Sequence, residues 1–380
     1  VMAAVSFVVI AALIGAPGLG KPIISALTIR NVGQGFVAGF AVVFLAILLD
    51  RSTSAAAKKQ VSFIPPSQKD LRRRRILIGV GALIAIACAY LSRTFLWAAV
   101  WPEQFNVATQ VENVTNSITK WILANLEIFT EGFKNLISYG VLNPLESLLA
   151  GSPWYVTVGF VVALALVVAG IRVAMLSLFL SLLIVLSGLW YESMLTLTQT
   201  IVGTLLTMLV GMALGIWTGR NDRVEKFLRP FLDAGQTLPA FVYLVPMLGL
   251  FGPTRFTAIA TGIVYSIPIV VKIVCEGIRS VPYSLVEAAT AAGSTTKQII
   301  TKVQLPAAKR TILLAVNQGL IYVLAVVVIG GFVGSGGLGY LVIVGNSKPE
   351  LQGKGLLAGA CILLLGVIFD RIMQASAKRS

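Results

Sequence analysis

The stretch GAPGLGK, from Gly15 to Lys21, has the G-x-x-x-x-G-K spacing of a loop that cradles nucleotide phosphates with backbone N–H groups and a lysine. Two local features argue against that chemistry. Pro22 stands where a Ser or Thr hydroxyl would hold Mg²⁺, and proline has no backbone N–H. A related stretch, GSGGLG at 334–339, is followed by Tyr340 and has no lysine. We therefore interpret the glycines as permitting a tight turn and close helix contact.

Other residue types that perform catalysis are absent or isolated. The chain contains no histidine, which excludes His-based proton transfer and His-ligated metal sites. Cys88, Cys275 and Cys361 each lie alone in an apolar stretch, without the spacing of metal ligands or of a disulfide framework. No nucleophile beside a base is visible. The sequence therefore predicts no catalytic residue, no metal, no cofactor and no enzyme.

The elements that position the remaining polar residues are expected to be helices in a membrane. Of 380 residues, 57% are hydrophobic and 12% are charged, about half of the roughly 25% charged residues usual in soluble domains. Apolar stretches of about 17 residues or more can cross a bilayer, and only helices satisfy the backbone there. The predicted fold class is an all-α polytopic membrane protein. We interpret the net charge of +15 as holding loops in the cytoplasm, not as binding nucleic acid.

Ten spans are predicted, near 1–15, 36–49, 76–92, 154–171, 172–190, 198–219, 238–252, 256–274, 312–333 and 355–369. The intervening segment 101–152 is polar, with scattered acids and tryptophans. Its amphipathic pattern predicts helices that lie along a membrane face.

The charges predict the sidedness. Of the 30 Lys and Arg, 22 fall on alternate connections, namely 50–75, Arg172, 220–235, 272–310 and 370–380. An excess of basic residues marks cytoplasmic loops. Both glycine turns then face outside, where there is no ATP, which is a third argument against a phosphate loop.

The sequence contains an internal repeat. GQGFVAGFAVVFLAILLDR (33–51) aligns without a gap with GKGLLAGACILLLGVIFDR (353–371), sharing glycines and a terminal Asp-Arg. The chain is therefore expected to be a piece of a tandem-fused double unit; a single unit with two extra N-terminal spans is the alternative. The expected organisation is a two-span C-terminal part of a first unit (1–57), a basic cytoplasmic linker (58–75), N-terminal spans with the external amphipathic segment (76–190), and the core of the second unit (191–380).

The most informative cytoplasmic segment is RSVPYSLVEAATAAGSTTKQIITKVQLPAAKR, residues 279–310. Pro282 suits the first turn of a helix, Gly293 ends it, and Ser294 or Thr295 caps a second short helix. Leu305-Pro306 is expected to end that helix and open the next span. Such a projecting helical turn is suited to dock in a groove of a soluble partner.

This segment resembles the EAA loop of ABC importer permeases, E-A-A-x₃-G-x₉-I-x-L-P, with Val303 in place of isoleucine. In that family the loop contacts the ATP-binding subunit. The resemblance implies that the docking turn and the return into the membrane are formed by Glu287, Ala288, Ala289, Gly293, Leu305 and Pro306.

The stretches 236–252, 265–282 and 303–320 further resemble permeases for glycine betaine, proline and related quaternary-amine osmoprotectants. The resemblance covers about 195–375 and, through the repeat, 1–51. It implies a type I ABC importer permease core with extra N-terminal spans in a bacterial inner membrane. The implied partners are two ATP-binding cassette subunits, an extracytoplasmic substrate-binding protein, a second permease unit, fused or separate, and membrane lipid.

Polar residues in or beside the spans are candidates for a substrate path, since polar groups in membranes usually face a cavity or another helix. Gln236, Tyr243 and Asn317 are the candidates, and Tyr243 suits a cation–π contact with a trimethylammonium. Hydrogen bonding between helices is the alternative role.

The function implied by the resemblance is a permease subunit of an ATP-driven importer, with alternating access coupled to a separate ATPase through residues 283–304. One alternative is an ABC permease for another small solute, such as an amino acid or taurine. The other is an ion-coupled secondary transporter, for which Glu276 is nearly the only carboxylate near a span.

Overall fold

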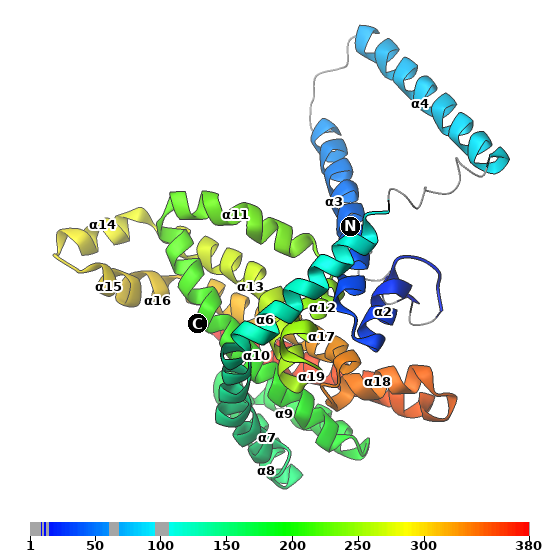
Figure 1. The fold of residues 1–380 in the computed structure, drawn as a ribbon. Helices are drawn as coiled ribbons and strands as arrows, with labels where there is room; N and C mark the ends of the chain where they lie inside the picture. Colours follow the sequence, from blue (N-terminus) through cyan, green and yellow to red (C-terminus); the bar gives the residue numbers. More distant parts are fainter. Residues whose placement is uncertain (1–8, 10, 13–14, 61–67, 96–105, 380) are drawn as a thin grey trace.

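The computed structural model describes residues 9, 11–12, 15–60, 68–95 and 106–379, and within these ranges the chain forms helices and turns without a strand (Figure 1). The all-α prediction is confirmed. The main elements are α2 (Gly20–Ile29), α3 (Val32–Gln60), α4 (Gln68–Thr94), α6 (Ala108–Ile137), η3 (Ser138–Leu142), α7 (Asn143–Leu149), α8 (Trp154–Ala169), α9 (Ile171–Leu186), α10 (Trp190–Arg220), α11 (Asp222–Thr237), α12 (Ala240–Phe251), α13 (Arg255–Arg279), α14 (Tyr283–Ala291), α15 (Thr296–Gln298), η4 (Ile299–Gln304), α16 (Leu305–Ala307), α17 (Lys309–Ile329), η5 (Gly330–Val333), α18 (Gly337–Ser347), η6 (Pro349–Leu351) and α19 (Gln352–Arg379).

In the described part of the chain, six helices are long and apolar enough to cross a membrane, or up to eight spans if two bent helix pairs each count as one. The six are Val32–Thr53, Arg75–Thr94, Trp190–Arg220, Arg255–Arg279, Lys309–Val333 and Pro349–Ala377. Each coincides with a predicted span. The predicted span 172–190 is the shorter apolar helix α9, of 16 residues. The predicted span 1–15 lies largely outside the described residues.

The predicted span 238–252 differs from a simple crossing helix. α12 has 12 residues, about 18 Å at 1.5 Å per residue, and it meets α11 at a bend of 101°. Leu238 is extended, with φ −81° and ψ 132°, because a residue that precedes a proline is disfavoured from the helical region. Pro239 therefore divides this segment into an exposed, amphipathic α11 and a buried, apolar α12.

The core of the bundle is formed by α10, α13 and α17, with α13 packed against both of the others. Val270, Val274 and Ile278 of α13 are buried in an apolar cluster with residues of α10 and α17. A second cluster joins α8 and α9 to α18 and α19. α4 stands apart in Figure 1, and its described side chains are exposed along its whole length.

The internal repeat of the sequence is also a repeat of structure. Each copy consists of a glycine turn, a short helix and a long helix: α2 and α3 in the first copy, α18 and α19 in the second. The turns have positive φ at matching positions, 84° at Gly15 and 78° at Gly334, a conformation that glycine adopts readily.

The predicted linker contains more helix than expected, whereas the predicted amphipathic segment is helical as expected. α3 continues to Gln60 and α4 begins at Gln68, so the ends of the predicted linker 58–75 are helical; residues 61–67 lie outside the described residues. The predicted amphipathic segment contains α6, a 30-residue helix that packs on α3 and α12. Its apolar side chains Ile128 and Phe129 are exposed. That this helix lies along a membrane face stays a prediction.

Candidate functional site

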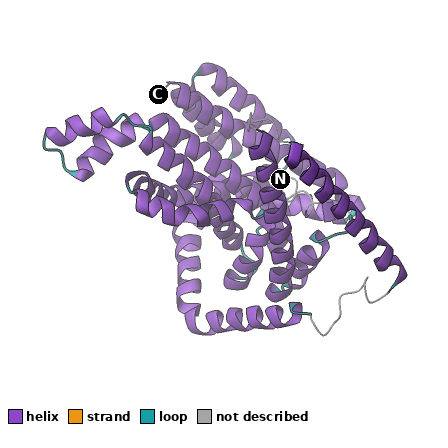
Figure 2. Ribbon diagram, turned by 90° about the horizontal axis from the view of Figure 1, so that it is seen from above, coloured by secondary structure: helices purple, strands orange, loops and turns teal. Residues whose placement is uncertain are grey.

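The segment predicted to dock a partner is a helical hairpin that projects beyond the bundle, as Figures 1 and 2 both show. α14 is the outgoing arm; α15, η4 and α16 form the return arm. The predicted helix after Pro282 is confirmed, with Pro282 itself extended at its N-cap.

Gly293 ends α14 as predicted, and its φ of +78° shows why. The N–H of Gly293 donates to the carbonyl of Thr290 at 2.9 Å, and the N–H of Ser294 donates to that of Ala289 at 3.0 Å. This pair of bonds is a Schellman motif, in which the residue past the helix must adopt the left-handed conformation. A Cβ at Gly293 would meet no described atom within 4 Å. The requirement for glycine is therefore conformational.

Thr295, not Ser294, caps the second short helix. Gln298 N–H donates to Thr295 Oγ1 at 3.4 Å, and Thr295 N–H donates to Gln298 Oε1 at 2.8 Å. This reciprocal capping box satisfies donors that a helix N-terminus leaves unpaired. The two caps fix the turn between the arms through hydrogen bonds made within residues 289–298.

The predicted break at Leu305-Pro306 is wrong by two residues. η4 continues into α16 through Leu305 and Pro306, and the chain departs from regular helix at Ala308, with φ −86° and ψ 5°. Pro306 lies in the first turn of α16, where a missing N–H and a fixed φ are tolerated.

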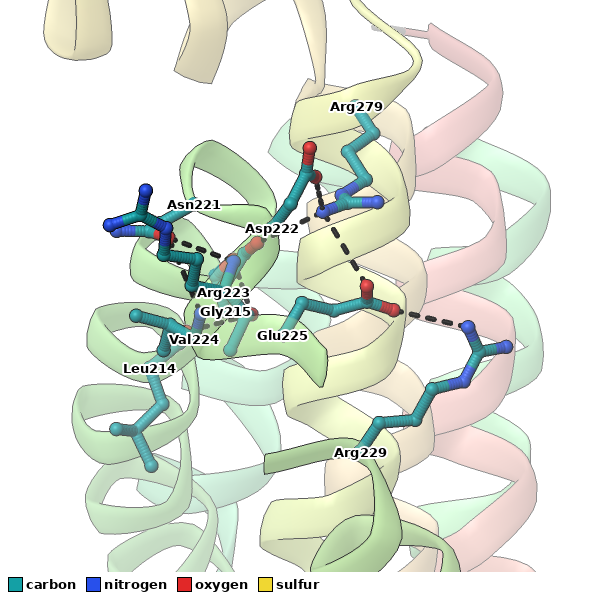
Figure 3. Close-up of polar contacts among 10 residues, drawn as sticks. Leu214, Gly215, Asn221, Asp222, Arg223, Val224, Glu225, Arg229 and Arg279 are labelled. Atoms are coloured by element: carbon teal, nitrogen blue, oxygen red, sulfur yellow. Dashed lines mark hydrogen bonds and ion pairs between the residues drawn. The ribbon is translucent and has the colours of Figure 1, made fainter. Parts of the chain in front are cut away.

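A charged cluster anchors the outgoing arm at its base, shown in Figure 3. Arg279, the last residue of α13, donates to Asp222 Oδ1 at 2.5 Å and pairs with Glu225 at 3.6 Å. Asn221 caps α11 by accepting from two backbone N–H groups, at 3.0 and 3.3 Å, so α11 begins directly beneath Arg279. Arg229 also pairs with Glu225, at 3.2 Å. α13 is thereby tied to α11 four residues before α14 begins.

The return arm is anchored to the same place. Gln304 at the end of η4 is buried, and its side-chain oxygen accepts from Arg220, the last residue of α10. The return arm is therefore joined by Arg220 to the end of α10, and the helix that precedes the outgoing arm is joined by Arg279 to the start of α11.

The outer surface of α14 carries the groups available to a partner. Tyr283 is 76% exposed and Leu285 is 48% exposed. Glu287 is exposed and makes no ion pair with any described residue. Val286 instead packs inward on the α13 cluster. Among the sequence-predicted loop residues, Ala289 accepts the Schellman bond and Ala288 is exposed. The arrangement presents an apolar and acidic surface suited to a protein groove.

Two of the three predicted path residues lie together. Tyr243 of α12 donates its hydroxyl to the carbonyl of Gly235 at 2.7 Å. The next residue, Gln236, accepts from Lys272 of α13 at 2.6 Å, and Lys272 also pairs with Asp233 at 2.5 Å. Gln236 therefore bonds between helices, as the alternative role proposed, and also lines a cavity of about 700 Å³ at α11.

Asn317 lies elsewhere, on the side of α17 that faces α19. Its amide donates to Asp370 Oδ1 at 2.9 Å, while its own side-chain oxygen is buried without a hydrogen-bond partner. Asp370 also accepts from Gln374 at 2.7 Å. Asp370 is a second carboxylate close to a span that the sequence interpretation overlooked.

The ring of Tyr243 begins a row of three tyrosines contributed by three helices. The ring centroids of Tyr243 and Tyr265 are 5.7 Å apart, and those of Tyr265 and Tyr322 are 5.5 Å apart. All three rings are partly exposed. The first pair meets edge to face, with ring planes 65° apart, and the second pair is tilted by 31°. A cation can bind to a ring face that the neighbouring ring leaves uncovered. The sequence interpretation missed Tyr265 and Tyr322, and it missed Arg279 and Gln304 at the loop. In the part of the chain that the structure describes, no cluster of three or more acidic or cysteine side chains could hold a metal ion.

Comparison with known proteins identifies the family of this chain. The model of the family "Binding-protein-dependent transport system inner membrane component" matches residues 208–380. The glycine betaine transport system permease protein OpuAB of Bacillus subtilis (strain 168) is 32% identical over 263 residues, which are 69% of this chain and 92% of that protein. ProW of Escherichia coli (strain K12), a glycine betaine/proline betaine transport system permease protein, is 34% identical over 68% of this chain and 73% of its own length. The chain belongs to this permease family.

A longer match reaches the N-terminal region. The trimethylamine N-oxide transport system permease protein TmoV of Pelagibacter ubique (strain HTCC1062) is 31% identical over 378 residues, 98% of this chain. The permease spans about half of that relative, 53%. The solved inward-facing MetNI methionine ABC transporter matches half of the chain at 23% identity with a TM-score of 0.43. Membership of the family makes this chain a multi-pass inner membrane component of a transport system.

Proposed function

We propose that the permease is a transmembrane subunit of an ATP-driven importer for osmoprotectants that carry a methylated, positively charged nitrogen. Alternating access is coupled to a separate ATPase through the hairpin 283–304. The observation that supports this proposal is the construction of the hairpin: it is capped at its tip, anchored at its base, and exposes Tyr283, Leu285 and Glu287 to a partner. Two ATPase subunits, an extracytoplasmic binding protein, a second permease unit and lipid are the proposed partners.

The anchors suggest how motion of the ATPase reaches the membrane. Force on α14 passes directly into α13, because only a short turn separates Arg279 from the hairpin. Arg279 holds α11, and Lys272 holds the far end of α11 through Asp233 and Gln236. α11 in turn ends beside Tyr243. The hairpin, α11 and the tyrosine row are therefore expected to move as one unit.

The substrate class is proposed from the relatives and from the tyrosine row together. Glycine betaine, proline betaine and trimethylamine N-oxide each contain a nitrogen that bears methyl groups and a positive charge. Aromatic faces attract such groups, by about 0.5 to 2 kcal/mol per contact. We place Tyr243, Tyr265 and Tyr322 on the path, with Gln236 beside it. Asn317 faces α19 and stays a prediction without support from the geometry.

The test is substrate-stimulated ATP hydrolysis by the permease reconstituted in liposomes with its second permease unit, its ATPase and its binding protein. Glycine betaine, proline betaine and trimethylamine N-oxide are supplied separately. Wild type and Gly293→Val are compared with Gly293→Asn, because asparagine enters the left-handed region far more readily than a β-branched residue. We expect at least one of the three solutes to stimulate hydrolysis, Gly293→Val to lose the stimulation, and Gly293→Asn to retain it.

The possible contrary results are distinct. Stimulation by an amino acid or taurine alone would correct the substrate class. Full stimulation of Gly293→Val would remove the hairpin from the coupling. Uptake that follows an ion gradient in the absence of the ATPase would replace the proposal with the ion-coupled alternative.

A further inference from the structure

The two copies of the internal repeat are packed on different sides, and the difference defines an interaction surface. The alignment pairs each residue of α3 with the residue 320 positions later in α19. One contact is the same in both copies. A Cβ on Gly35 would lie 3.2 Å from Ala26 of α2, and a Cβ on Gly355 would lie 3.0 Å from Gly345 of α18. Gly345 matches Ala26 when the glycine turns 15–20 and 334–339 are aligned. The pairs α2–α3 and α18–α19 are therefore equivalent in structure as well as in sequence.

In the first copy, α12 packs against the glycines of α3. A Cβ on Gly35 would lie 2.8 Å from Val245, and a Cβ on Gly39 would lie 3.1 Å from Val242. Val245 and the neighbouring α12 side chains are buried by this contact. Small residues at this spacing let helices approach closely, so α3 is built to pack on α12.

The N-terminus of α3 is held by α6 through polar groups. Gly33 N–H donates to Asn116 Oδ1 at 2.9 Å, and Asn31 donates to Glu112 at 2.7 Å. Phe36 lies between α6 and α12, where it lines a cavity of about 520 Å³. α3 is thus seated on two helices of the core region.

In the second copy, the equivalent face of α19 has no such neighbour. A Cβ on Gly353 or Gly359 would meet no described atom within 4 Å. Leu356, the equivalent of Phe36, is 79% exposed and borders a groove of about 530 Å³ with Gly355 and Gly359. A glycine within a helix costs about 1 kcal/mol relative to alanine, and contact with lipid chains does not require it. We name Gly353, Leu356 and Gly359 the cross-unit face.

The opposite side shows the reverse pattern. Leu365 and Ile368 of α19 are each 3% exposed in the cluster with α8, α9 and α18. Their equivalents on α3, Leu45 and Leu48, are 43% and 64% exposed. Each long helix therefore has neighbours on one face only. α19 is covered on the face that meets the helices of its own unit. α3 is covered on the face that, in a pair of units, would meet the other unit.

We propose that the cross-unit face of α19 packs on the α12-like and α6-like helices of a second permease unit, the one whose last two helices are α2 and α3. Each unit then places its final long helix on the α12 of the other, which is the reciprocal contact of a twofold pair. A second copy of this chain does not fit, because its own α3 already covers its α12. This inference rests on the proposed function only in that permease units work in pairs.

The test is photo-crosslinking of the permease in its native membrane. p-Benzoylphenylalanine replaces Leu356, and in a control it replaces Val167 of α8, which is 80% exposed. After irradiation, adducts are identified by mass spectrometry. Leu356 is expected to give a peptide from a permease sequence that aligns with 240–251 or 108–137 but differs from them. Val167 is expected to give lipid adducts.

A second substitution checks the fit of the glycines. Gly359→Leu is expected to abolish the protein adduct at position 356, whereas Gly79→Leu on α4, also without a described neighbour within 4 Å, is expected to preserve it. Four results would each overturn the proposal. At position 356 these are lipid adducts alone, an adduct to residues 240–251 of this chain, or an adduct to a protein that is not a permease. The fourth is a protein adduct that survives Gly359→Leu. Copurification of the ATPase from the same membranes is measured separately; its absence would count against the proposed function and not against the interface.

Discussion

The close contact between α10 and α13 gives the most quantitative prediction. Gly211, Gly215 and Gly219 of α10 are spaced four residues apart and face α13. A Cβ on Gly215 would lie 2.6 Å from the Cβ of the fully buried Val274. A Cβ on Gly211 would lie 2.5 Å from Val270, but there the nearest atom is the terminal Cγ1.

The two positions should therefore differ when alanine is introduced. Alanine favours the helix by about 1 kcal/mol over glycine, and overpacking typically costs about 1 to 3 kcal/mol. The Cβ of Val270 would lie 3.1 Å away, so it needs to shift only slightly. Its Cγ1 can turn aside through a departure of about 30° from its rotamer, which costs about 0.5 to 1.5 kcal/mol, so Gly211→Ala is expected to be nearly neutral. The Cβ of Val274 is fixed by its backbone, so Gly215→Ala must push the helices apart. We expect a loss of about 1 to 2 kcal/mol in the free energy of unfolding.

Unfolding can be followed with a thiol-reactive dye, because Cys275 and Cys361 are buried. The exposed Cys88 is first replaced by serine. Gly132→Ala on α6, where a Cβ meets no described atom within 4 Å, serves as the control and is expected to melt at or above the parent. If Gly215→Ala melts as high as Gly132→Ala, the tight α10–α13 contact does not limit stability and the reasoning is refuted.

Two further predictions concern function. Arg279→Gln should leave the melting temperature almost unchanged, because partly exposed ion pairs contribute about 0 to 1 kcal/mol, yet it should reduce substrate-stimulated ATP hydrolysis by uncoupling α13 from α11. The control is Arg229→Gln, which breaks an ion pair only within α11. Equal effects of the two substitutions on ATP hydrolysis would contradict the anchoring role. Tyr265→Leu should lower uptake at subsaturating glycine betaine about 2- to 30-fold, which is equivalent to one cation–π contact. Tyr265→Phe should retain most of the uptake. Equal losses in both variants would show that the aromatic ring face does not bind the substrate.

The sequence predicted best what depends on neighbours in the chain. Gly293 as a helix end and Thr295 as one of two possible caps follow from backbone conformation and from side chains that reach three residues onward. The error at Leu305-Pro306 has the same origin. A proline is compatible with either the end or the first turn of a helix, and only the path of the chain into α17 decides between them.

What the sequence could not predict are contacts between distant segments. Arg279 and Asp222 are 57 residues apart, and no feature of the sequence around either residue indicates that the two form an ion pair. Tyr265 and Tyr322 each resemble an ordinary tyrosine in a span until α12, α13 and α17 bring the rings together. The spacing of Gly211 and Gly215 is visible in the sequence as a helix-packing stripe, but it does not identify α13 as the helix that fills it.

The repeat shows why similar sequences need not have similar surroundings. The alignment of 33–51 with 353–371 correctly indicates that α3 and α19 are the same kind of helix. It gives no reason for Leu45 to be exposed while its equivalent Leu365 is buried. The reason is that a long amphipathic or uniformly apolar helix in a membrane protein has several usable faces, and its tertiary neighbours decide which of them is covered. α3 and α19 are copies of one helix with opposite faces covered. The neighbours of α3 therefore predict what covers the exposed face of α19, and the neighbours of α19 predict what covers the exposed face of α3.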